Sequence, residues 1–340
     1  MKYLSYLNLR VLPIAILMAI AALPVFAKTV TIKGIEYTYD VNTGEAKVHY
    51  GGKYKGVLTI PESIEVEGNT YTVTEIEEGA FYYYIEDYIS GDTFSSELEG
   101  VIIPNTVTKI GYRAFYECIS LRNISIPASV TVIDENAFEW YYGYVILEEV
   151  IMQDLTAWCN IDFGSEDANP VNRTFTKVYI EGKLLTDQLV IPEGIEKIKK
   201  YAFCHFGVTS VKIPESVTEI GYLAFRECYN LTSVYCYNPI PPEIDSQAFY
   251  TGDVTLYVPE GSKESYEADP NWSNFPNIEE FDPAGIEEVE ADEDDMLPTE
   301  YFNLSGMKVA TVAPGESPAS LPAGLYITRR GSRTAKVLLP

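Results

Sequence analysis

The sequence has very little histidine and none of the common catalytic or nucleotide-binding motifs. His49 and His205 are the only histidines among 340 residues, and no Cys-x-x-Cys pair occurs. This argues against zinc centres and histidine-dependent triads. Gly-x-Ser-x-Gly, P-loop, Gly-x-Gly-x-x-Gly and His-Glu-x-x-His patterns are missing as well. With 50 acidic residues the chain has candidates for the carboxylate pair of a glycosidase, but no two of them stand in a sequence pattern that marks such a pair. We expect no enzyme activity, no catalytic residues, no cofactor and no metal site.

Basic residues are scarce too. Against 50 Asp and Glu stand 24 Lys and Arg, which gives a net charge of -26 and a pI near 4.4. Such a chain repels nucleic-acid phosphates and anionic lipid headgroups. We therefore expect neither nucleic acid nor a membrane surface as a partner.

Long hydrophobic runs are confined to the N-terminus. Residues 1–27 combine Lys2 and Arg10 with a short apolar core and end in Val-Phe-Ala at Ala27, which is typical of a cleaved signal peptide. No later stretch is long and apolar enough for a membrane helix. We expect export to the periplasm, the cell surface or the medium, with no membrane-spanning segment in the mature chain.

Cysteine is also sparse, and its count of five is odd. Cys118 and Cys228 each stand three residues after a repeated phenylalanine, which favours a repeated, buried role as a small hydrophobe. A disulfide framework is the less favoured alternative.

What the sequence has is a repeat. "IPNTVTKIGYRAFYEC" from Ile103 and "IPESVTEIGYLAFREC" from Ile213 share eleven of sixteen residues. Pro104 and Pro214 are 110 residues apart, which is five times 22, a length typical of solenoid repeats. The 11-residue step from proline to phenylalanine recurs in four pairs: Pro104–Phe115, Pro127–Phe138, Pro192–Phe203 and Pro214–Phe225.

Each repeat also predicts a short strand and a buried ring. Patterns such as "LRNISI" from Leu121 and "LTSVYC" from Leu231 precede the next coil and are typical of leucine-rich-repeat strands. Because side chains alternate along a strand, we expect Ile124 and Ile126 to face the core and Ser125 to face outward. The Ala next to each Phe lets coils approach, so the rings should stack into a buried spine.

These residues resemble the BspA-type leucine-rich repeats of exported bacterial surface proteins. The resemblance implies a mainly β protein, a leucine-rich-repeat solenoid of about 22–23-residue coils with an N-terminal β-hairpin cap and a small C-terminal β module. The region from Val150 to Gln188 departs from the pattern, and we expect a half-coil or hairpin turning at Glu181-Gly182. The expected domains are a signal peptide (1–27), an N-terminal β cap (28–55), the solenoid (56–281), an acidic linker (282–298) and a small β-rich module (299–340).

Both ends of the solenoid carry their own signals. The alternating residues around Asn42-Thr43-Gly44 predict a capping hairpin. The C-terminal segment is similar to a shortened version of the sorting module that some Gram-negative anaerobes use for secretion and surface attachment. A plain β appendage is the equally weighted alternative.

The outward strand positions predict the binding face. If the apolar residues of the strands point inward, the candidate ligand-binding side chains are Tyr179, Lys212, Tyr235 and Tyr257, with Val190 and Ile151 further along the same sheet. Ordinary scattered surface tyrosines are the alternative, in a chain that has 27 of them. The aromatic stretches from Phe81 and from Phe138 could stack on sugars, but convex-side packing is favoured.

We expect a monomeric, exported, non-enzymatic scaffold that mediates protein–protein interaction or adhesion at a cell surface. The alternatives are a glycan-binding accessory of a surface polysaccharide system and a self-associating surface-layer component.

Overall fold

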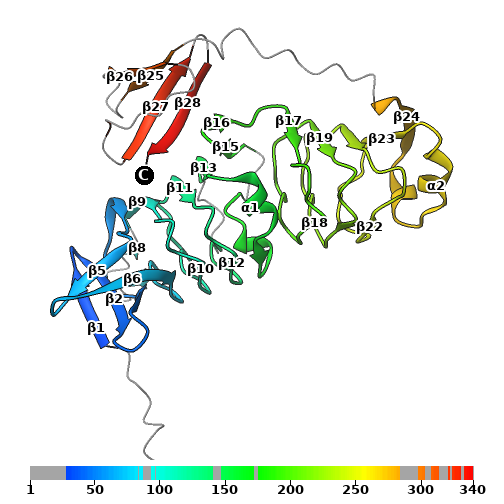
Figure 1. The fold of residues 1–340 in the computed structure, drawn as a ribbon. Helices are drawn as coiled ribbons and strands as arrows, with labels where there is room; N and C mark the ends of the chain where they lie inside the picture. Colours follow the sequence, from blue (N-terminus) through cyan, green and yellow to red (C-terminus); the bar gives the residue numbers. More distant parts are fainter. Residues whose placement is uncertain are drawn as a thin grey trace, which may run out of the picture.

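The computed structural model describes residues 28–82, 84–86, 93–95, 97–140, 147–171, 175–283, 298–302, 308–313, 321, 324–330 and 333–339. The proposed signal peptide, nearly all of the acidic linker and much of the two aromatic stretches lie outside these residues. The described chain forms an elongated β solenoid with a separate four-stranded sheet near its N-terminal half (Figure 1). Among the described residues, no helix has both the length and the apolar character needed to cross a membrane.

Two series of sheets run along the solenoid, one built of longer strands and one of short strands. The longer strands form a six-stranded sheet and a five-stranded sheet. In spatial order, the six-stranded sheet contains β16 (Lys183–Leu184), β15 (Lys177–Ile180), β13 (Glu149–Met152), β11 (Asn123–Ile126), β9 (Glu97–Ile102) and β4 (Lys55–Thr59). The five-stranded sheet contains β17 (Gln188–Val190), β19 (Ser210–Ile213), β21 (Ser233–Cys236), β23 (Thr255–Pro259) and β24 (Asn277–Phe281).

The second series forms the opposite side of each coil, and its strands from Lys109 onward have only two residues each. An eight-stranded sheet joins β1 (Lys28–Ile32), β2 (Ile35–Asp40), β3 (Glu45–Val48), β6 (Asn69–Ile76), β10 (Lys109–Ile110), β12 (Val132–Ile133) and β14 (Asp162–Phe163), with β5 (Ser63–Val66) paired to β6. A three-stranded sheet joins β18 (Lys197–Ile198), β20 (Glu219–Ile220) and β22 (Glu243–Ile244). The expected hairpin is present, because β2 and β3 pair antiparallel around residues 41–44.

Within the described ranges, the remaining elements are a separate sheet, a small hairpin and four short helices. The separate sheet has the order β26 (Lys308–Val312), β25 (Thr299–Phe302), β27 (Gly324–Arg330) and β28 (Arg333–Leu339), and β7 (Tyr84–Glu86) pairs with β8 (Thr93–Ser95). The helices are α1 (Leu155–Cys159), the 3₁₀ helix η1 (Glu166–Ala168), α2 (Lys263–Ala268) and the 3₁₀ helix η2 (Trp272–Asn274). The solenoid makes about nine turns of roughly 24 residues.

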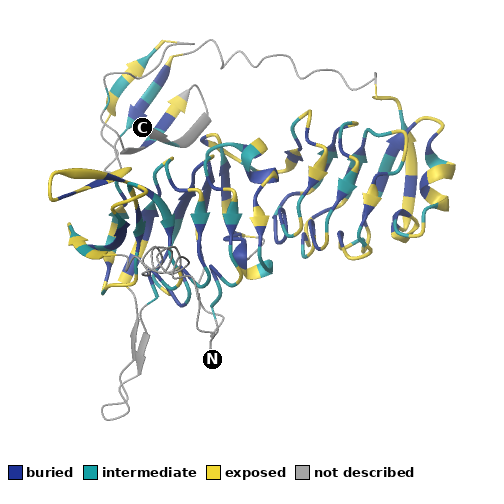
Figure 2. Cartoon of the chain, turned by 60° about the horizontal axis from the view of Figure 1, so that its bottom comes forward, coloured by how far each residue is buried: buried dark blue, intermediate teal, exposed yellow. Residues whose placement is uncertain are grey.

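The phenylalanine spine is confirmed, but it is divided in two. Phe115 stacks between Phe81 and Phe138 with centroid separations of 4.9 and 5.0 Å. Phe225 stacks between Phe203 and Phe249 at 5.3 and 4.7 Å. Every ring of both stacks is buried. Buried residues, dark blue in Figure 2, recur from coil to coil along the solenoid. The coils approach closely beside the spine, since a Cβ on Gly221 would lie 2.8 Å from the backbone nitrogen of Lys200.

All five cysteines are buried and none forms a disulfide, as the repeat positions of Cys118 and Cys228 predicted. Burial raises the pKa of the Cys159 and Cys228 thiols to about 12 and that of Cys236 to about 11. A neutral thiol is a poor nucleophile and a poor metal ligand. These cysteines therefore pack as small core residues.

An irregular coil interrupts the repeat between the two spine stacks. Asp154 Oδ1 accepts a hydrogen bond from Ala157 N at 2.6 Å and begins α1, which replaces the usual turn. Strand β15 then turns back into β16 at Glu181 and Gly182, with φ of 50° and 79°, so the predicted hairpin at this position is confirmed. Within the described residues, no ladder links β14 to β18 or β15 to β17.

Side-chain hydrogen bonds connect the two parts of the solenoid where the backbone ladder ends. We define the joint as this contact between residues 147–171 and the coil that starts at Gln188. Trp158 Nε1 donates to Ala202 O at 2.8 Å. Asn169 Nδ2 donates to Tyr201 O at 2.8 Å and to Ala202 O at 3.1 Å. Both side chains are buried, so the joint is a set of shielded hydrogen bonds.

Candidate functional site

The outer face of the five-stranded sheet brings three of the four predicted site residues into one row. Val190 lies in register with Lys212, Lys212 with Tyr235, and Tyr235 with Tyr257. Glu279 continues the row on β24. Parallel strands without register shifts place equivalent side chains about 4.8 Å apart, which is why residues from separate repeats meet.

The tyrosines of this row form part of a larger aromatic cluster, which we define as Tyr235, Tyr237, Tyr257 and Phe281. The Tyr235 and Tyr257 rings stack with centroids 4.6 Å apart and an interplanar angle of 10°. Phe281 meets Tyr235 at 5.8 Å and Tyr237 at 5.1 Å, both nearly edge-on. All four side chains are half-buried, so their rims remain accessible.

Tyr237 and Phe281 were not among the residues predicted from the sequence. Tyr237 lies two residues beyond Tyr235, and Phe281 lies two residues beyond Glu279, so strand alternation already places each on the outer side. The "YCY" string was an available signal. The prediction considered only one position per strand and so left out half of the cluster.

Burial and neighbouring groups raise the pKa of two hydroxyls in the aromatic cluster. The pKa of Tyr257 is raised mainly by burial, and to a smaller extent by the neighbouring Tyr235 and Glu279. Burial, then Tyr235 and Glu193, raise the pKa of Tyr237. Neutral phenols both donate and accept hydrogen bonds. The cluster therefore offers ring edges and hydroxyl groups between Lys212 and Glu279.

The fourth predicted residue, Tyr179, lies elsewhere. It belongs to β15 of the six-stranded sheet, in register with Ile151 on one side and Leu184 on the other. It is only 8% exposed, whereas the prediction placed it on an open surface and on the same sheet as Tyr235. The sheet breaks because the β15–β16 hairpin reverses the chain, and sequence alternation cannot reveal such a break.

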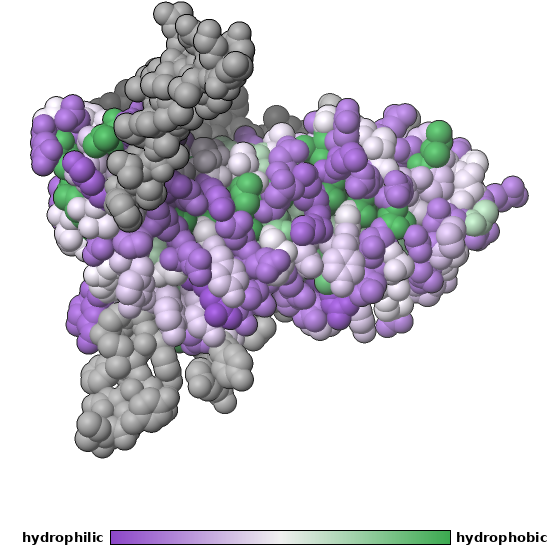
Figure 3. All heavy atoms as spheres, turned by 90° about the horizontal axis from the view of Figure 1, so that it is seen from below, coloured by the Kyte–Doolittle hydropathy of each residue, from purple (hydrophilic) through white to green (hydrophobic). Residues whose placement is uncertain are grey.

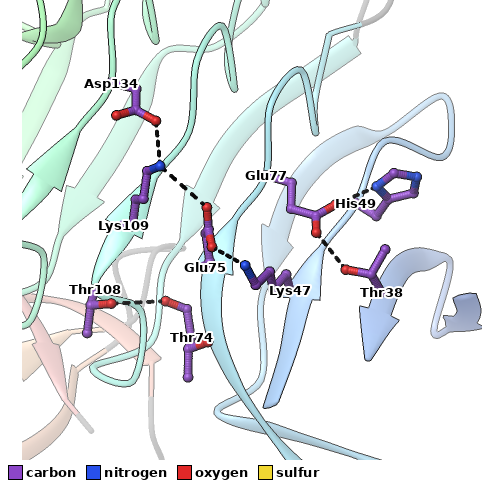
Figure 4. Close-up of polar contacts among 9 residues, drawn as sticks. All are labelled: Thr38, Lys47, His49, Thr74, Glu75, Glu77, Thr108, Lys109 and Asp134. Carbon is purple, nitrogen blue, oxygen red and sulfur yellow. Dashed lines mark hydrogen bonds and ion pairs between the residues drawn. The ribbon is translucent and has the colours of Figure 1, made fainter. Parts of the chain in front are cut away.

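The short-strand side carries a self-neutralised chain of charges instead of aromatic residues (Figure 4). Glu75 lies 2.5 Å from Lys47 Nζ and 3.7 Å from Lys109 Nζ, and Lys109 also contacts Asp134 at 2.8 Å. Viewed from this side, the surface is largely hydrophilic (Figure 3). These four charges have partners within the chain, so the aromatic cluster is the stronger candidate for ligand binding.

One buried histidine lies between two carboxylates near the joint. His205 Nε2 is 2.8 Å from Glu166 Oε1, and His205 Nδ1 is 3.2 Å from Glu227 Oε2. A metal ion needs one ring nitrogen and both carboxylates directed at a single point, whereas here each nitrogen faces its own carboxylate. The His205 side chain thereby bridges three neighbouring coils through the two carboxylates.

This bridge predicts an acid-sensitive contribution to stability. The hydrogen bond from His205 holds the pKa of Glu166 below its ordinary value of 4.5. Because the pKa of Glu166 is lower in the folded chain than in the unfolded chain, its ionised carboxylate stabilises the fold at pH values above the unfolded-state pKa. This stabilisation is lost as the pH falls through the folded-state pKa. We expect the urea midpoint to fall more between about pH 5 and pH 3 for the wild type than for Glu166→Gln. Equal slopes for the two proteins would contradict the assignment.

Comparisons with known proteins agree with this architecture. Six copies of the family described as the BspA type leucine rich repeat region match residues 87–151 and 179–264. The repeat region is thus a leucine-rich-repeat solenoid whose repeats are similar to the BspA type. No curated protein matches the chain.

Three solved structures are among those similar to the chain. A leucine-rich repeat protein from Bacteroides capillosus is 23% identical, with 45% of this chain and 99% of that chain covered and a TM-score of 0.34. The T. pallidum leucine rich repeat protein is 17% identical over 62% of this chain and 86% of that chain, with a TM-score of 0.37. The pneumococcal vaccine antigen PcpA is 14% identical over 75% and 99%, with a TM-score of 0.27.

Proposed function

We propose that this protein is an exported, non-enzymatic binding scaffold, and that the outer face of the five-stranded sheet binds a protein partner at a cell surface. The observation that carries the proposal is the stacked Tyr235–Tyr257 pair and the aromatic cluster around it. Half-buried tyrosines with few rotatable bonds are typical of interaction hot spots. The repeat architecture supports this function, because stacked strands present one continuous surface to a partner.

The ring geometry favours protein over glycan as the ligand. A sugar ring packs on an open aromatic face, but Tyr235 and Tyr257 turn a face toward each other at 4.6 Å. The pair therefore presents edges and hydroxyls outward, which suit the side chains and backbone of a polypeptide.

The test is capture of proteins from host or bacterial surface extracts with the mature chain. Replacing Tyr235 and Tyr257 together by Ser should weaken capture about 30-fold or more, because loss of a hot spot costs at least ~2 kcal/mol. The matched control replaces Tyr229 and Tyr250, an exposed pair 5.6 Å apart that the five-stranded sheet does not contain. The control should bind as the wild type does.

Three outcomes of this experiment would overturn the proposal. Undiminished capture by the Tyr235/Tyr257 variant would place the binding face elsewhere. Capture of polysaccharide in place of protein would support the glycan-binding alternative. Concentration-dependent self-association without any foreign ligand would indicate a surface-layer component.

A further inference from the structure

In the outer row of the six-stranded sheet the three central residues are buried, whereas Leu184 at the β16 edge of the row is 40% exposed. Ser125, Ile151 and Tyr179 occupy consecutive register positions on β11, β13 and β15. They are 4%, 5% and 8% exposed. The corresponding row of the five-stranded sheet is open, with Lys212, Tyr235 and Tyr257 half-buried and Val190 51% exposed. Repeat position alone therefore does not explain the burial.

The C-terminal sheet lies beside the half of the solenoid in which the row is buried. Figure 1 shows β25–β28 above the six-stranded sheet, and strand β28 lies in contact with β16 at the edge of that sheet. Strand β24, which ends the solenoid, lies at the far end of the rod, although only residues 282–298 separate it from β25. Residues 282–298 connect the C-terminal sheet to β24 and not to β16. The position of the sheet beside β16 therefore depends on the contact between β28 and β16.

Charge complementarity supports the same contact. Residues 299–340 contain five Lys and Arg against two Glu, whereas the whole chain has 24 basic and 50 acidic residues. The C-terminal module is therefore the basic part of an acidic protein. Arg333 and Lys336 lie on β28, the strand that contacts β16 at the edge of the six-stranded sheet. Opposite net charges steer two domains together and make their contact sensitive to salt.

We propose that the outer face of the six-stranded sheet is a second interaction surface, and that this chain's own basic C-terminal sheet covers it reversibly. The proposal rests on the function proposed above and concerns its regulation: in the covered state only the five-stranded half of the outer face is open to a partner. A basic β-sheet protein is the kind of external partner that can compete for the covered half.

Two features of the contact make release feasible. The C-terminal sheet has its own backbone ladder, in which β27 and β28 pair along seven residues, so leaving the solenoid breaks none of those bonds. The covered surface is also imperfectly matched, because the buried Ser125 hydroxyl has no hydrogen-bond partner. A buried polar atom without a partner weakens a permanent interface.

The test uses the mature full chain and a matched pair of substitutions. Ile151→Arg introduces a charge on the outer face of the six-stranded sheet, which the C-terminal sheet is proposed to cover. Val190→Arg introduces the same charge in the exposed outer row of the five-stranded sheet. We expect Ile151→Arg to lengthen the maximum dimension in small-angle X-ray scattering and to speed tryptic cleavage after Arg333 and Lys336 about tenfold or more. Val190→Arg should match the wild type in both measurements.

A second variant keeps the proposal falsifiable if Ile151→Arg disturbs the solenoid. Arg333→Glu with Lys336→Glu leaves the solenoid sequence intact and should give the same longer scattering dimension, as should raising the salt concentration of the wild type from 20 to 500 mM. Unchanged scattering in the charge-reversed variant and at high salt would overturn the proposal. Neither readout uses a partner, and the Tyr235/Tyr257 variant should scatter as the wild type does, so failure of the binding proposal is distinguishable.

Discussion

Truncating Phe225 to Ala should destabilise the protein by roughly 3–5 kcal/mol, the cost of an uncollapsed core cavity. The ring lies at the centre of a stack, between Phe203 at 5.3 Å and Phe249 at 4.7 Å, and is fully buried. The coils on either side are fixed, since Phe225 N donates to Ala248 O at 2.7 Å, so the site cannot close around the void. Urea unfolding followed by circular dichroism measures the loss.

The matched control for this substitution is Tyr222→Ala in the same coil. Tyr222 is 40% exposed and meets only the edge of Tyr201 at 5.7 Å, so its truncation should cost less than about 1 kcal/mol. Because coupling in a solenoid is between neighbours, the Phe225 variant should also loosen the coils that carry Phe203 and Phe249. An unfolding midpoint equal to that of the wild type would refute the role of the spine.

Replacing Asn169 by Ala should uncouple the two halves of the solenoid at the joint, at a cost of about 2–4 kcal/mol. This fully buried amide donates to Tyr201 O and Ala202 O, and its oxygen accepts from Val171 N at 2.9 Å. No backbone ladder replaces these bonds across the joint in the described chain. We expect one cooperative urea transition to become two, with a lower apparent slope.

Asn230→Ala provides the control for the joint. Asn230 is exposed and donates to Gly207 O at 3.2 Å between two coils that are also linked by paired strands. Its loss should leave a single transition, with a change below about 1 kcal/mol. A single transition of normal slope in the Asn169 variant would show that the joint is not the weak point of the rod.

The candidate site was only partly accessible to sequence reasoning, and the reason is physical. Alternation along a strand depends on neighbouring residues, so the outward direction of Tyr235 and Tyr257 follows from the sequence alone. Stacking of their rings depends on unbroken register between repeats, which the constant repeat length also implies. Tyr179 obeys the same alternation, but its exposure depends on a sheet that lies more than 100 residues away in the chain.

The sequence by itself determined the features that recur in every coil. The strand positions, the buried Phe rings and the buried cysteines follow from local spacing, because every coil meets the same neighbours. The hairpin at Glu181-Gly182 belongs to the irregular coil, and its turn residues predicted it without any periodicity. Three other features were decided only by the tertiary structure. They are the hydrogen bonds of Trp158 and Asn169 across the joint, the His205 bridge, and the burial of Ser125 and Ile151. These depend on contacts between non-equivalent segments, which leave no periodic trace in the chain.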